Sequence, residues 1–438
     1  MPEIIPSVEP AAEFLEISND FTDAKEIVRE AISNAFDAGA KAIHIEAHID
    51  KTQGQDELVV VITDDGQGMD EGGVKAFFSL GVSTRRTVDR LGRKATPAIG
   101  EKGHGTKIYF NSRRIEVTTV GAGQKIHAFM DEPRQTLRRN NLPAVKYDIE
   151  TASAPTGTEV KVRGYNSNNQ AGFGHNELRD YIYWFTKFGS AELEFSVEQH
   201  RDTKLYLQGL GRGEPECLRF GHPFPAENTD VRSLRRSDKV SPLDYYVAKW
   251  VFPQEPLDGM PNSKLDFIFL LEGDQAKRQY NPMIHEKYAA WLDGQYRVED
   301  RYGLWLCKDF IPIARRNDWV AERSEWTKYH AFVNSQDFHL PANRADLENT
   351  PRPVLYAIEK TVRRLFESRI KPTEKFQKYI EELQKEELYR SAEQEEKDFE
   401  RRKRSALRKE VADLDGHTLF APRQESGVFS LFLQVATM

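Results

Sequence analysis

The stretch REAISNAFDAG, residues 29–39, carries the most informative polar residues of the chain. It ends a segment, residues 23–39, in which apolar residues recur at helical spacing, so we expect a helix there. Spacings of four and three residues place Glu30, Asn34 and Asp37 on one face of that helix. A carboxylate one turn away from a carboxamide can activate water beside a metal-bound anion. The same face could also be the solvated side of an amphipathic helix.

A second motif, DDGQGM at residues 64–69, directly follows the strand-like run ELVVVIT at residues 57–63. This run is apolar and β-branched almost throughout, which predicts a strand in the interior of a sheet. A carboxylate at the end of a strand, followed by two glycines, suits a loop that approaches a flat ligand closely. A turn into the next helix would use the same residues.

A third motif, GEKGHGTK at residues 100–107, offers backbone N–H groups of the kind that bind phosphate. It differs from a P-loop, in which lysine precedes the hydroxyl residue, because here Thr106 precedes Lys107. It also lacks the glycine spacing and the preceding strand of a dinucleotide-binding loop. A fourth motif, Gly157-Thr158 before the strand-like EVKV, carries little information alone.

In this order and at these spacings, the four motifs resemble the GHKL ATPase superfamily. That superfamily comprises DNA gyrase B, the ninety-kilodalton heat-shock chaperone, histidine kinases and MutL. The resemblance spans roughly residues 20–165. It implies a Bergerat-type ATP-binding fold, which is an α/β sandwich with a mobile lid, here expected at about residues 72–106. It also implies ATP and Mg²⁺ as ligands.

The resemblance further implies a role for each matching residue. Glu30 would be the general base that deprotonates the attacking water, Asn34 would ligate Mg²⁺, and Asp37 would support the site. Asp64 would accept a hydrogen bond from the adenine amino group, and Thr158 would complete adenine recognition through water. The other expected ATP-binding residues are Lys41, Gly66, Gly68, Met69, Ser83, Thr84, Gly100, Lys102, Gly103, His104, Gly105, Thr106 and Lys107.

Beyond residue 165 the sequence predicts a second mixed region. Helices are expected near 176–188 and 351–369, and strands at 192–197, 203–208, 246–252, 264–271 and 303–313. The segment DFHLPANRADLENTPRPVLYAIEKTVRRLF, residues 337–366, resembles the middle-domain segment of the heat-shock chaperone. The resemblance implies that Arg344 is a catalytic residue that contacts the γ-phosphate from the second domain. A surface arginine that caps the following helix is the alternative.

The expected fold class is α+β, in four consecutive parts. A Bergerat-type ATP-binding sandwich occupies residues 1–165, and a ribosomal-protein-like α/β transducer domain occupies residues 166–370. Residues 371–412 should form a charged helix or coiled coil, since 23 of the 40 residues from 371 to 410 are charged. Residues 413–438 would begin a C-terminal region that we expect to be truncated.

Composition excludes several classes of protein. The chain has 438 residues, a net charge of −7 and 39% hydrophobic residues, which is too apolar for a wholly disordered chain. No apolar run approaches the ~18–20 residues that span a bilayer, and no secretory signal is visible, so we expect no membrane partner. The two cysteines, Cys217 and Cys307, lack disulfide-framework or zinc-site spacing, which favours a cytoplasmic location.

We therefore expect a magnesium-dependent ATPase, chaperone-like or MORC-like, that hydrolyses ATP slowly. It would form a homodimer through its ATP-binding domains and act as a clamp or motor on DNA or a protein client, in DNA management or antiviral defence. A chaperone for client proteins and a nucleotide-binding switch without significant turnover remain open. A histidine kinase is disfavoured, because only about 20 residues precede the first helix, too few for a phosphoacceptor helix.

Overall fold

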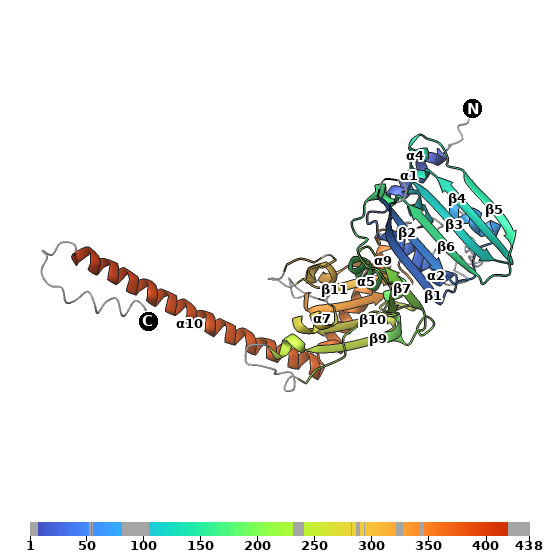
Figure 1. Ribbon diagram of the computed structural model, residues 1–438. Helices are drawn as coiled ribbons and strands as arrows, with labels where there is room; N and C mark the ends of the chain where they lie inside the picture. Colours follow the sequence, from blue (N-terminus) through green and yellow to red (C-terminus); the bar gives the residue numbers. More distant parts are fainter. Residues whose placement is uncertain are drawn as a thin grey trace, which may run out of the picture. The chain divides into compact units, whose positions relative to one another are not determined.

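The computed structural model describes residues 8–51, 54, 56–80, 105–230, 241–281, 283–285, 290–292, 294–320, 327–340 and 346–418. They form a mixed α/β protein with two sheets, which confirms the expected α+β class at this level. The chain divides into two compact units, Met1–Phe376 and Gln377–Met438, and both sheets belong to the first (Figure 1).

The first sheet contains eight strands in the order β5-β4-β3-β6-β2-β1-β7-β8. All neighbouring strands are antiparallel except β1 and β7, which are parallel. The apolar run at residues 57–63 forms most of β2, in the interior of the sheet as its sequence predicts. The strands are β1 (Ala42–Asp50), β2 (Glu57–Asp64), β3 (Arg114–Gly121), β4 (Gln124–Asp131), β5 (Val145–Thr151), β6 (Gly157–Arg163), β7 (Lys204–Gln208) and β8 (Glu216–Arg219).

Helices bury their apolar sides in one core with this sheet. The core unites side chains of α2, such as Ile27 and Ile32, with Ile45 of β1 and Leu205 of β7. It therefore continues past residue 165, where the sequence predicts the end of the ATP-binding domain. The main helices of this region are α1 (Pro10–Asn19), α2 (Glu26–Asp37), α3 (Glu71–Phe78), the 3₁₀-helix η1 (Gly105–Phe110), α4 (Pro133–Arg138) and α5 (His175–Phe185).

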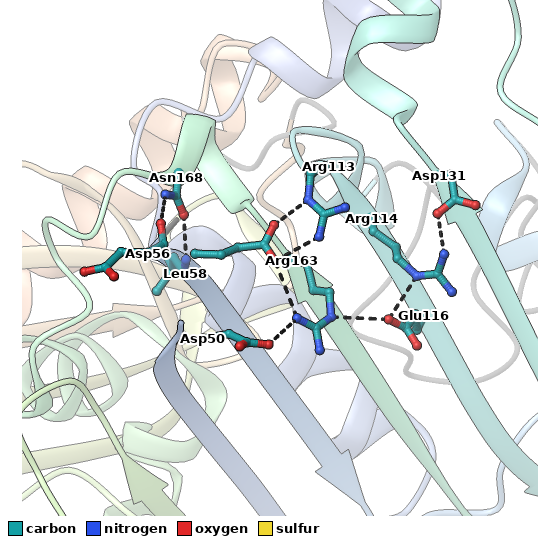
Figure 2. A network of polar contacts seen from close by, with 10 residues as sticks. Asp50, Asp56, Leu58, Arg113, Arg114, Glu116, Asp131, Arg163 and Asn168 are labelled. Carbon is teal, nitrogen blue, oxygen red and sulfur yellow. Dashed lines mark hydrogen bonds and ion pairs between the residues drawn. The ribbon is translucent and has the colours of Figure 1, made fainter. Parts of the chain in front are cut away.

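On the other face of the sheet, a ladder of charged side chains links five strands, as Figure 2 shows. Arg163 of β6 donates to Asp50 of β1 at 2.8 Å and to Glu57 of β2 at 3.4 Å. Arg114 of β3 contacts Glu116 on its own strand and Asp131 of β4. Partly exposed ion pairs are individually weak, but this network holds the five strands in register at the end of β2 remote from residue 64.

The second sheet has five strands in the order β12-β11-β13-β10-β9, and only β11 and β13 are parallel. Its strands are β9 (Val247–Leu257), β10 (Met260–Glu272), β11 (Gly303–Lys308), β12 (Ile311–Arg315) and β13 (Tyr329–Asn334). The amphipathic helix α9 (Arg352–Leu365) packs on β9 and β10 and ends in a π-helical turn at Phe366–Ile370. Two short helices, α7 (Asp274–Tyr280) and α8 (Val298–Arg301), lie between β10 and β11 in the chain.

A long helix, α10 (Glu374–Thr418), covers the charged region that the sequence predicts to be helical. Its described side chains include exposed Leu388, Phe399 and Leu407. Among the described residues, no helix combines the length and the apolar character needed to cross a membrane.

Two strand predictions in the second region are wrong. Residues Glu192–Phe195 form a 3₁₀-helix, because Glu192 is buried in an ion pair with Lys187 and Ser196 adopts a left-handed conformation. The single strand expected at 303–313 is a hairpin of β11 and β12, which turns at Asp309 and Phe310, both with positive φ. The structure also contains β8 and β13, which the sequence analysis did not predict.

Candidate nucleotide-binding site

Glu30 and Asn34 lie together on helix α2. The helix buries its apolar residues in the core and leaves these two side chains half-buried on its other side. The Asn34 carboxamide Nδ2 donates a hydrogen bond of 3.2 Å to Glu30 Oε1. Because α2 is packed along its length, its fold positions the carboxylate and carboxamide as one unit.

The start of η1 lies directly against this pair. A Cβ atom added at Gly105 would lie 2.0 Å from the carboxylate carbon of Glu30, far inside van der Waals contact. Only glycine therefore allows the backbone to approach the carboxylate in this way. The structure thus brings Gly105, the last glycine of the motif, to Glu30.

Thr106 and Lys107 attach η1 to the end of α3. Both the Thr106 hydroxyl and the Lys107 amino group donate to the carbonyl of Phe77, each at 2.8 Å, and Lys107 Nζ also lies 2.6 Å from Thr106 Oγ1. Lys107 is completely buried. Burial lowers the pKa of the Lys107 ammonium to about 7, and the negative charge of Glu30 opposes that shift.

Tyr109, also on η1, is buried beside α3. Burial raises the pKa of its hydroxyl well above the usual range, and the charges of Glu30 and Asp64 add to this effect. Its ring stacks on that of Phe77 with centroids 5.5 Å apart. The two carboxylates that the sequence analysis selected on separate motifs therefore act on one buried tyrosine.

Asp64 ends β2 and faces Thr158 across the β2–β6 pair. The Thr158 hydroxyl lies 3.0 Å from that of Thr119 on β3, and Thr119 Oγ1 accepts a 2.9 Å hydrogen bond from the backbone N–H of Met69. Asp64, Met69 and Thr158 are thus gathered at one end of the sheet. Sequence reasoning missed Thr119, although a hydroxyl at a core-facing position of an alternating strand could have indicated it.

The loop after Asp64 needs both of its glycines. The N–H of Gly66 donates to Asp64 Oδ1 at 2.9 Å, and a Cβ on Gly66 would lie 2.7 Å from Ala38 Cβ at the end of α2. Gly68 has a φ of +70°, and its Cβ would lie 1.9 Å from the carbonyl oxygen of Val120. The loop is therefore held between α2 and β3, and it fixes the orientation of the Asp64 carboxylate.

Asp37 and Lys41 lie at the other end of α2, beside residues 199 and 200. Lys41 Nζ donates to the carbonyl of Gln199 at 3.2 Å. Burial lowers the pKa of His200 to about 4; the charges of Lys187 and Lys41 add to this shift, and that of Asp37 opposes it. The structure therefore groups Asp37 and Lys41 around His200, and it groups Glu30 and Asn34 with Gly105.

Seven of the expected site residues lie outside the described residues, and the structure places none of them: Ser83, Thr84, Gly100, Lys102, Gly103, His104 and Arg344.

The chemistry of the site fits a magnesium–nucleotide complex. Among the described residues, no group of three His, Cys, Asp or Glu side chains could hold a metal ion. Mg²⁺ commonly takes one or two protein oxygens and completes its shell with phosphate oxygens and water. Because Asn34 donates through Nδ2, its Oδ1 is the atom that would contribute such a ligand.

A helix-backed sheet with Glu30 on a helix, Asp64 at a strand end and Gly105 against the Glu30 carboxylate is compatible with a nucleotide-binding domain of the GHKL class. Residues 22–155 match the family model described as "Histidine kinase-, DNA gyrase B-, and HSP90-like ATPase". This part of the chain therefore belongs to the GHKL superfamily, which confirms the family that the motifs indicate, and ATP binding is a property of that family. A search of curated proteins finds no match to the chain.

Proposed function

We propose that the protein binds ATP with Mg²⁺ and hydrolyses it slowly, with Glu30 as the general base. One observation carries this proposal: the Glu30–Asn34 pair lies directly against the backbone of Gly105. A site that only binds nucleotide has no need of a carboxylate held at the phosphate end.

Adenine would be recognised at the sheet end of the site. A carboxylate is a good acceptor for the adenine amino group, and the Gly66 N–H holds that of Asp64 in one orientation. The hydroxyls of Thr158 and Thr119 lie beside it and can bind a water that bridges to the base. Gly66 and Gly68 keep the loop close to the sheet, so that Met69 can pack along the base.

The phosphates would lie beside the Glu30–Asn34 pair and the backbone of Gly105, which contact each other directly. Asn34 would contribute an oxygen to Mg²⁺, which when bound neutralises charge on the phosphates. Glu30 would orient a water molecule and accept its proton, and its hydrogen bond from Asn34 holds the carboxylate in place. Arg344, from the second region, is proposed as the basic residue that contacts the γ-phosphate.

We further propose that nucleotide binding drives homodimerisation through the ATP-binding domains, and that the dimer acts as a clamp or motor on DNA or a protein client in the cytoplasm. The two-sheet organisation of residues 8–376 supports a coupling of this kind, since α2 packs against elements on both sides of residue 165. Light scattering with and without a non-hydrolysable ATP analogue tests this part. A mass that is unchanged by the analogue would contradict it.

Two variants separate binding from hydrolysis. Glu30→Ala should retain ATP affinity and lose phosphate release, because the base is removed and the adenine contacts remain. Asp64→Asn should lose ATP affinity, because the amide presents a donor to the adenine amino group. Equal phosphate release by the wild type and Glu30→Ala would overturn the hydrolytic role. Unchanged ATP affinity in Asp64→Asn would overturn the assignment of the adenine end.

A further inference from the structure

The outer edge of strand β5 is exposed, at the end of the first sheet (Figure 1). Its pairing with β4 is continuous from Val145 to Thr151, and among the described residues β4 is its only strand partner. The backbone N–H of Ala152 donates to the carbonyl of Gly123 at 3.0 Å. This bond shows which residues of β5 form backbone hydrogen bonds with β4. In an antiparallel pair the direction of hydrogen bonding alternates along each strand. Even-numbered residues of β5 therefore bond to β4, and odd-numbered residues direct their N–H and C=O groups outward.

The outward-bonding residues also carry exposed apolar side chains. Tyr147 is 43% exposed and Ile149 is 39% exposed, although both lie on the face of the sheet that elsewhere forms the core. A mainly apolar pocket of about 430 Å³ adjoins them, lined by Phe14, Val74, Phe78, Leu142 and Tyr147 among others. A long, unbulged edge strand with exposed apolar residues is a template for pairing with another strand.

The charged residues of β5 indicate which strand would pair with its exposed edge. We propose that β5 pairs in an antiparallel manner with β5 of a second copy of this chain, about a two-fold axis at Tyr147. In that register Lys146 of each copy lies opposite Asp148 of the other, and Val145 lies opposite Ile149. The two charged pairs occupy non-hydrogen-bonded positions, where side chains across the pair are closest.

Neighbouring registers are disfavoured by the same residues. A shift of the axis to Lys146 places Lys146 opposite Lys146, and a shift to Asp148 places Asp148 opposite Asp148. The second shift also places Lys146 opposite Glu150, so the charges disfavour the first shift more strongly. Like charges directly opposite each other destabilise a strand pair. Registers that place odd-numbered residues opposite even-numbered ones would turn the two apolar faces to opposite sides. Pro143 has no N–H to donate and limits the pair at its ends.

This interface does not involve the ATP site, and it goes beyond the nucleotide-driven association proposed above. It joins two eight-stranded sheets into one and exists in the absence of nucleotide. Substitution of Glu30 leaves it unchanged. The two proposals can therefore fail separately when nucleotide-driven association is measured on Lys146→Glu, which should not pair through β5.

Analytical ultracentrifugation of the full chain without nucleotide tests the pairing. We expect a reversible dimer for the wild type, with a dissociation constant that rises roughly ten-fold or more in Lys146→Glu and in Asp148→Lys, because each change replaces two attractive pairs with two repulsive ones. A one-to-one mixture of these two variants should recover the dimer, since each then supplies the charge that the other needs. The double variant Lys146→Asp/Asp148→Lys should also recover it.

Lys204→Glu is the matched control, because Lys204 is an exposed residue of the same sheet that lies on β7, opposite Arg219 and away from the β5 edge. It should dimerise like the wild type, and all variants should melt at similar temperatures. A wild type that remains monomeric over the concentration range would overturn the proposal and would assign the edge to a different partner. A dimer that survives both single reversals, or a mixture that fails to recover, would also overturn it.

Discussion

At Gly105 the backbone and a carboxylate meet at a distance that leaves no room for a single methyl group. The atoms that a Cβ at Gly105 would meet are the carboxylate atoms of Glu30. A side chain of this kind can rotate away, whereas a backbone atom in the same place could not. The contact with Gly105 therefore affects the orientation of the Glu30 carboxylate more than the stability of the fold. This makes Gly105 the position at which the alignment of the proposed base can be changed without removing the base.

Gly105→Ala should reduce phosphate release by about ten-fold or more while leaving ATP affinity within a few-fold, because misplacement of a catalytic group by ~1 Å can slow a reaction ~100-fold. The free energy of unfolding should change by less than ~1 kcal/mol, since a flexible side chain gives way. Gly213→Ala is the control, because nothing lies within 4 Å of a Cβ there. Identical phosphate release by Gly105→Ala and the wild type would show that the contact does not align Glu30.

Lys107 makes stability depend on pH. Its pKa falls from an ordinary value near 10.5 to about 7 in the folded chain because of burial. Below pH 7 the lysine is protonated in both the folded and unfolded chains, and its contribution is constant. Between pH 7 and 10.5 the unfolded chain binds a proton that the folded chain does not, so the free energy of unfolding rises with pH.

We expect this rise to reach a few kcal/mol at most by pH 10. Urea unfolding of the ligand-free wild type and of Lys107→Met, at several pH values between 6.5 and 9.5, measures it. The difference in stability between the two proteins should shift in favour of the wild type as pH increases. A difference that is independent of pH would contradict the lowered pKa.

At the scale of single residues, the sequence selected Glu30, Asn34, Asp64 and Thr158 as site candidates because their spacing resembles a known pattern, and their roles stay predictions. It could not predict that the Lys107 ammonium would donate to the carbonyl of Phe77, since that depends on how η1 packs against α3. For Thr119 the only signal in the sequence is a hydroxyl at a core-facing position of a strand, and the contacts with Met69 and Thr158 arise only when the sheet has formed.

The loop between β2 and α3 is the element that holds Asp64 at the end of the site proposed to bind adenine. Its position depends on Gly68, which combines a left-handed backbone with a contact on the carbonyl of Val120. Gly39 at the end of α2 has a similar φ, +75°, but no atom within 4 Å of a Cβ. Replacing Gly39 by alanine therefore measures the free energy lost to a left-handed backbone alone. Replacing Gly68 measures that loss together with the loss from a steric clash.

Gly39→Ala should lower the free energy of unfolding by about 1–2 kcal/mol, the penalty of a left-handed residue with a Cβ. Gly68→Ala should lower it by more than ~3 kcal/mol, because the backbone of β3 or of the loop must also move. Urea unfolding of both variants beside the wild type gives the comparison. Equal losses would mean that the loop can shift away from β3 without penalty.

Helices and strands whose apolar residues repeat at a regular spacing could be predicted from the sequence. Elements whose conformation depends on contacts with distant parts of the chain could not. The α2 helix, β2 and the hairpin of β3 and β4 follow regular apolar patterns that match their burial. The turn between β11 and β12 was missed because Asp309 and Phe310 adopt positive φ without a glycine. In β13 every residue is buried, so its sequence shows no alternation that marks a strand.

At the scale of the whole molecule, the first sheet is completed by a late part of the chain. Strand β7 lies parallel to β1, with Leu205 opposite Ile43 and Leu207 opposite Ile45. Sequence analysis placed the boundary at residue 165 because the motifs end there, and motifs carry no information about strands that pair from a distance. The core that supports α2 includes Leu205, Leu218 and Phe220, and it also takes in Ile311 of β12.

A fragment that ends at residue 165 should therefore aggregate or melt well below a fragment that ends at residue 224. It leaves the edge of β1 and the apolar residues beneath α2 uncovered, and each buried leucine so lost is worth roughly 1.5–3 kcal/mol. Thermal melting followed by circular dichroism, together with gel filtration, compares the two fragments. Equal melting temperatures would contradict the extended domain.

The central claim, that Glu30 is the base in an ATP-hydrolysing site, is tested most directly by phosphate release from Glu30→Gln at saturating ATP. The glutamine preserves the size of the side chain and can still accept the hydrogen bond from Asn34, but it cannot take a proton from water. We expect ATP affinity close to that of the wild type and phosphate release lowered by about 100-fold or more. Phosphate release at the wild-type rate, with ATP bound equally well, would contradict the account.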